Sequence, residues 1–205
     1  MNILLFGLLL LSQEESAAAR FLSGNPPALP PLAADGGLVG LELRIAPSGI
    51  VQEAIVIDDS PPFTEEMKKV VRLWRFEPPE GRGSHRVAAF ALFRAPTLLG
   101  GAPPPPERIS SPSLEIPYPI STATPAYPPQ AFEPGVVMLE LAVDERGAVS
   151  GVEILRHAGG FDAVAVEAAW KFRFEPAERE GISVPSYAVL VLGFPQPVGP
   201  PLRRH

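Results

Sequence analysis

The chain has 205 residues, a formal net charge of −6 and no cysteine. The lack of cysteine excludes disulfides, cysteine-based zinc sites and thiol catalysis. The acidic balance argues against broad nucleic-acid binding, which needs clustered Lys and Arg. The 27 prolines indicate that a good part of the chain is linker or extended segment.

The first 19 residues have the pattern of a secretory signal peptide. The run from Ile3 to Leu11 is apolar but far shorter than the roughly 20 residues that span a bilayer. Ala17-x-Ala19 supplies a small-residue cleavage site. We therefore expect a signal peptide at 1–19 and a periplasmic protein. No Lys or Arg precedes the apolar run, so a misassigned start that hides an inner-membrane anchor is the alternative.

Two strand pairs are predicted further along the chain. Residues 39–45 and 137–143 alternate apolar with small or polar side chains, which is typical of strands with one buried face. A four-residue turn ending in Gly49 or Gly147 follows each run, as hairpins favour. Residues 51–57 and 149–155 are the predicted returning strands.

One helix and one last strand should follow each hairpin. The helices are indicated by apolar residues at i, i+4, i+7, i+8 and i+11, namely Phe63, Met67, Val70, Val71 and Trp74, and then Phe161, Ala165, Ala168, Ala169 and Phe172. The last strands are expected at 87–93 and 187–194. The aromatic residues that follow each stripe are expected to pack in the core: Trp74, Phe76, Phe172 and Phe174.

The two blocks align without a gap. Gly37 falls on Gly135, 98 residues further along, and residues 75–78 fall on an identical tetrapeptide at 173–176. This match indicates an internal duplication. We predict an α+β fold of two tandem two-layer β-β-α-β domains, each a small antiparallel sheet with one helix on one face.

The second block resembles the TonB C-terminal domain family. The resemblance lies in the run 127–131, the strands around Asp144-Glu145-Arg146-Gly147, the stretch Trp170-Lys171-Phe172-Arg173-Phe174-Glu175-Pro176-Ala177, and the turn Gly181-Ile182-Ser183-Val184-Pro185. The first block keeps Trp74-x-Phe76-x-Pro78 and Gly49. It lacks a counterpart of Tyr127-Pro128, with which the second block begins. We expect a Pro-rich linker at 20–36, a degenerate first domain at 37–96, a Pro-rich linker at 97–126, a second domain at 127–195 and a tail at 196–205.

The resemblance implies a protein-binding module linked to transmembrane transport. Such domains grip outer-membrane transporters by strand addition, in which a partner strand pairs with an open sheet edge. The expected partner is an extended segment of an outer-membrane or envelope protein, without nucleic acid and without a stable membrane span. The predicted edge is the uncharged run of Tyr187, Ala188, Val189, Leu190, Val191 and Leu192.

Other interpretations stay open. The last strands of the two copies could pair with each other or within a homo-oligomer, or the Pro-rich linker could cover the edge; the protein would then be a structural envelope scaffold without a transport role. A true energy transducer with a misassigned start is a third possibility. An enzyme is not expected, because His85, His157 and His205 are isolated and no convergent titratable set is visible. No cofactor or metal site is predicted.

Overall fold

A computed structural model describes residues 19–30, 35–78, 85–96, 103–129, 131 and 133–196. Within these ranges the main feature is a seven-stranded sheet with the strand order β6-β3-β2-β5-β13-β8-β9. The predicted signal peptide lies outside the described residues, except for Ala19, which is buried. No described helix is long and apolar enough to span a bilayer.

The two halves share the order strand, strand, helix, short strand and last strand, and among the described residues the second half adds a pair of short strands before its last one. The α+β class is confirmed. The first half consists of β2 (Gly37–Ile45), β3 (Val51–Asp59), α1 (Phe63–Val71), β4 (Arg75–Phe76) and β5 (His85–Phe93). The second half consists of β8 (Gly135–Val143), β9 (Val149–Arg156), α2 (Asp162–Ala169), β10 (Arg173–Glu175), β11 (Ala177–Arg179), β12 (Ile182–Val184) and β13 (Ser186–Phe194).

Short strands lie in the segments expected to be Pro-rich linkers. β1 (Phe21–Ser23) pairs with β4, and β7 (Tyr118–Ser121) pairs with β10. β6 (Glu107–Arg108) pairs with the end of β3. These segments are therefore fastened to the two halves through backbone hydrogen bonds.

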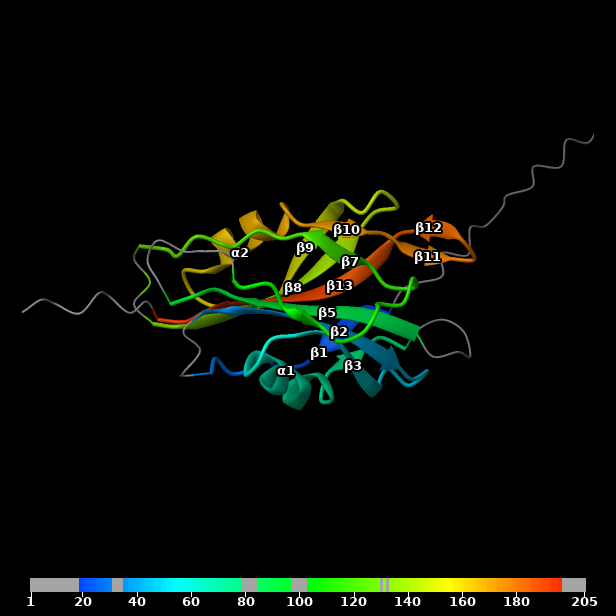
Figure 1. Cartoon of the computed structure of the whole chain (residues 1–205), viewed down its shortest axis with the longest axis horizontal. Helices are drawn as coiled ribbons and strands as arrows, with labels where there is room; N and C mark the ends of the chain where they lie inside the picture. The colour runs from blue at the N-terminus through cyan, green and yellow to red at the C-terminus, as the bar shows by residue number, and fades with distance from the viewer. Residues whose placement is uncertain are drawn as a thin grey trace, which may run out of the picture.

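The two halves share one sheet because their last strands pair in parallel. β5 and β13 run side by side, from Ala88 opposite Ala188 to Phe93 opposite Gly193. Within each half, the strands are antiparallel. The two helices lie on opposite faces of the joint sheet (Figure 1), as expected when equivalent strands meet in parallel and each helix keeps its place on its own half.

Each face of the sheet carries its own core, and both halves contribute to each. Phe90 and Leu92 of β5 lie in the α2-side core with Leu190 of β13, while Val189 and Val191 of β13 lie in the α1-side core. The predicted core aromatics are confirmed as buried: Trp74, Phe76, Phe172 and Phe174. The two halves thus share one sheet and both cores. The expected domain boundaries stay predictions.

The two glycine turns hold the same local geometry. Gly49 and Gly147 have φ values of +79° and +75°, a conformation that L side chains rarely adopt. The N–H of Phe76 donates to the Gly49 carbonyl at 2.9 Å, and Phe174 donates to Gly147 at 2.8 Å. Each hairpin turn is thereby fixed against the short strand that follows its helix.

Candidate partner-binding site

The predicted edge strand is internal, so the expectation of an open edge at residues 187–192 is wrong. β13 pairs with β8 on one side and with β5 on the other. Residues 188–194 are all buried, which is typical of a strand covered on both faces. The pairing of the two last strands with each other, considered above as an alternative, is what the structure contains.

The open edge of the sheet lies on β9. Among the described residues, β9 pairs only with β8 and ends the strand order on that side. The opposite edge is covered at one end, because β6 pairs with Asp58 and Asp59 of β3. The N–H groups of Ile109 and Ser110 donate to the Ile57 carbonyl. Among the described strands, β9 therefore offers the longer stretch without a partner on its outer side.

A hollow of about 280 Å³ lies beside this edge, on the sheet face that carries α1 in the other half. Its floor is a row of residues paired across three strands: Gly151 of β9 faces Ala142 of β8, which faces Tyr187 of β13. The next row along the same face starts with Glu153 and Glu140. We call this site the Gly151 hollow; its lining is Arg20, Glu140, Ala142, Gly151, Val152, Glu153 and Tyr187.

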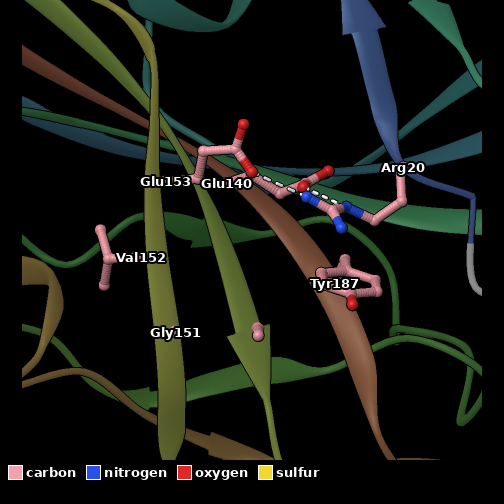
Figure 2. Close-up of a pocket in the computed structure, with 7 residues that line it drawn as sticks. Arg20, Glu140, Gly151, Val152, Glu153 and Tyr187 are labelled. Atoms are coloured by element: carbon pink, nitrogen blue, oxygen red, sulfur yellow. Dashed lines mark hydrogen bonds and ion pairs between the residues drawn. The ribbon is translucent and has the colours of Figure 1, made fainter.

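Arg20, from the segment before β1, lies across the hollow (Figure 2). Its guanidinium donates to Glu140, and it donates to Glu153 Oε2 at 2.8 Å. The guanidinium carbon also lies 4.5 Å from the centre of the Tyr187 ring, a favourable cation–π distance. The chain itself therefore places one cation between two carboxylates and an aromatic ring.

The two carboxylates differ in their surroundings. The side chain of Glu140 is only 3% exposed, and its second oxygen accepts the N–H of Phe21 at 2.7 Å. Burial raises the pKa of Glu140 above its ordinary value, although the hydrogen bonds from Phe21 and Arg20 act in the opposite direction. Glu153 is 64% exposed, so it is the carboxylate that a ligand can reach from solvent.

The first half has the same rows, but long side chains fill them. Glu53, Arg44 and Arg86 stand where the second half has Gly151, Ala142 and Tyr187. Arg44 pairs with Glu53 at 2.9 Å, and Arg86 donates to the buried Glu42. The hollow is thus a feature of the second half, where small residues replace an ion pair.

Two other clusters of titratable residues have structural roles. His157 contacts the carboxylate of Asp162, the first residue of α2, at 2.7 Å and is 72% exposed, so this pair lies at the surface. Asp58 is buried, and it accepts Arg108 Nε at 2.7 Å and the Tyr118 hydroxyl at 2.8 Å. This cluster holds the connecting segment against β3.

Sequence reasoning missed Arg20, Glu140, Gly151 and Glu153. One signal could have pointed to Glu140, namely the triplet Leu-Glu-Leu that stands at equivalent positions in both blocks. Alternation places both of these glutamates on the polar face of their strands, but the structure buries both and supplies each with an arginine. The source of that arginine differs between the halves, and local sequence does not reveal it.

A strand–strand–helix–strand unit is a small α+β domain, and an open edge strand is a place where such a domain can add a further strand. Comparison with known families narrows this class. Residues 123–191 match the family described as Gram-negative bacterial TonB protein C-terminal. This match places a domain of that family within the second half of the chain, at residues 123–191. No curated protein matches the chain. That the first half is a degenerate copy stays a prediction.

Proposed function

We propose that the protein is a periplasmic TonB-like binding module, linked to transport, that holds an extended segment of an outer-membrane or envelope protein by strand addition. The family match of residues 123–191 supports the class of function. The observation that carries the proposal is that no strand in the described part of the chain pairs with the outer side of β9. An open strand edge presents N–H and C=O groups that a second strand can satisfy.

The proposed edge differs from the one predicted from sequence. β13 has both sides paired within the chain, so a partner strand could reach it only by breaking the β5–β13 pairing. β9 is eight residues long, Val149–Arg156. Its outer backbone N–H and C=O groups can pair with a partner strand while every strand pairing within the chain stays intact.

The test is a peptide titration of the whole chain from Arg20, followed by amide chemical shifts. The isolated second half is unsuitable, because Ala88, Phe90 and Leu92 of β5 belong to the core on which α2 packs. Peptides from the N-terminal segments of outer-membrane transporters should shift residues 149–156. The controls are two peptides N-methylated at alternate residues, one at the odd and one at the even positions. In one of them the methyl groups replace the N–H groups that would donate to β9, and that peptide should not bind. Shifts elsewhere, or none, would contradict strand addition at β9.

The β5–β13 pairing favours a second candidate, the structural envelope scaffold. In this protein the last strands pair with each other and join the two halves into one rigid sheet, so their edges cannot bind a partner. If the folded chain binds none of the transporter peptides, the scaffold becomes the better interpretation.

A further inference from the structure

We propose that the Gly151 hollow is a side-chain pocket for a basic residue, lysine or arginine, of the segment that adds to β9. This inference rests on the proposed strand addition and adds the chemistry of the partner to it. It follows from the shape of the floor, the charges around it and the comparison between the two halves.

The floor is open where a side chain from an added strand would cross. An added strand would lie about 4.8 Å beyond β9 and place every second side chain on the face of the hollow. Gly151 carries no side chain, and a Cβ built there would meet only Ala142, at 3.3 Å. A long side chain opposite Gly151 could therefore lie across β9 and reach Glu140 and Ala142 on β8, about two strand spacings away.

The charges around the hollow favour a cation. Two carboxylates, Glu140 and Glu153, face one guanidinium, that of Arg20, so this group carries one net negative charge. Glu153 contacts Arg20 through Oε2 at 2.8 Å, and its second oxygen can accept a hydrogen bond from an incoming ammonium or guanidinium. Such charge-assisted hydrogen bonds are stronger than neutral ones.

The chain already shows which group this surface accepts. Arg20 reaches the hollow from a different part of the chain and lies over the Tyr187 ring at 4.5 Å. In the first half, cations occupy the same rows, with Arg44 and Arg86 beside Glu53 and Glu42. The second half keeps the buried glutamate, has an aromatic ring at Tyr187 and carries only a methyl group at Ala142, which leaves room for a basic residue from outside.

The probe is a pair of short extended peptides of alternating threonine and valine. One has a central arginine and the other has citrulline, which has nearly the same shape without the charge. We expect the arginine peptide to bind the whole chain about tenfold more tightly, as one good charge-assisted hydrogen bond would give. Its extra shifts should fall on Ala142, Gly151 and Tyr187, and its advantage should shrink in high salt.

Substitutions in the chain give a matched control. Glu153→Gln should remove most of the arginine preference, whereas Glu53→Gln changes the charge equally on the edge strand of the other half and should leave it intact. The pair Ala142→Arg with Gly151→Glu copies the filled rows of the first half and should abolish the preference. Because Glu153 and Glu53 are both surface residues, neither single change should unfold the chain.

The outcomes separate this inference from the proposed function. If both peptides shift β9 with equal affinity, the basic pocket is wrong and strand addition stands. If the arginine preference survives Glu153→Gln, the pocket is likewise wrong. If neither peptide shifts β9 while the chain is folded, strand addition and the pocket both fail.

Discussion

Truncating Phe90 to alanine should destabilise both halves of the chain together. Phe90 belongs to β5 of the first half, yet its buried ring lies in the α2-side core, 6.2 Å from the centres of the Phe174 and Tyr118 rings. Losing the buried side chain costs about 2–3 kcal/mol in transfer free energy. A residual cavity of roughly 80 Å³ would add about 2 kcal/mol. The free energy of unfolding should therefore fall by about 4–5 kcal/mol, and the melting temperature by roughly 10–15 °C.

The two tryptophans let one experiment read each half separately. Trp74 is buried in the first half, and Trp170, 44% exposed, follows α2 in the second. Single-tryptophan variants made with Trp74→Phe and Trp170→Phe should show coincident unfolding, and Phe90→Ala should shift both transitions equally. If Phe90→Ala moved only the Trp74 transition, the halves would be independent domains and the shared-core reasoning would be refuted. Phe174→Ala is the control of equal size within the second half and should cost about 3–5 kcal/mol.

Two further predictions concern the second half. Gly147→Ala should destabilise the chain by at least about 1–3 kcal/mol in denaturant unfolding, because its φ is +75° and a Cβ would lie 1.8 Å from the Phe174 carbonyl oxygen. Gly159→Ala, with nothing within 4 Å of its Cβ, should lower the free energy of unfolding by much less. Equal decreases for the two variants would contradict the backbone strain expected at Gly147→Ala. The second prediction concerns Glu140, whose raised pKa makes the folded chain bind a proton more readily than the unfolded one. Stability contributed by this group should therefore rise as pH falls through its folded pKa. The difference in unfolding free energy between Glu140→Gln and the unaltered chain should change as pH is lowered towards the ordinary glutamate pKa, and a constant difference would show that Glu140 titrates normally.

Local patterns were enough to predict the elements of each half. Alternation along 39–45 and 137–143, the glycine turns and the apolar stripe beginning at Phe63 each depend on nearby residues, and the structure has strands, turns and helices there. The aromatic residues after each helix also lie in the core as expected. These features are set by periods of two and 3.6 residues, which a sequence displays directly.

The arrangement of the halves depends on pairing between distant strands. The uncharged run at 187–192 was interpreted as an open edge, although near-continuous apolar sequence is typical of a strand buried on both faces. Residues 87–93 carry the same signal. Two such strands in one chain satisfy each other, and the parallel pairing of β5 with β13 does this. The apolar composition of the last strands therefore does indicate strand pairing, but the pairing strand belongs to the same chain and not to another protein.

The Gly151 hollow was even less visible in the sequence. It requires the cross-strand register that places Gly151, Ala142 and Tyr187 in one row. It also requires Arg20, which lies 120 residues before Glu140 and reaches it only in the folded chain. Neither the register nor this long-range ion pair follows from a local period.

The joint sheet makes the two halves unequal, although they share one order of elements. Each half uses its last strand to pair with the other half. The remaining edge of the first half is then β3, and that of the second half is β9. The end of the β3 edge, from Val56 to Asp59, is covered by β6 and by Ser110, whose hydroxyl donates to the Val56 carbonyl at 2.7 Å. In the first half the rows beside that edge are also filled, by Arg44 and Glu53.

The second half keeps both its edge and its hollow open. It is also the half that matches the TonB C-terminal family. If duplication freed one copy to serve as a fixed support, partner binding should be lost when β9 is blocked and should survive changes on β3. Glu153→Gln and Glu53→Gln therefore test more than the charge of one pocket. They ask whether the binding surface lies in one half of a sheet that both halves build.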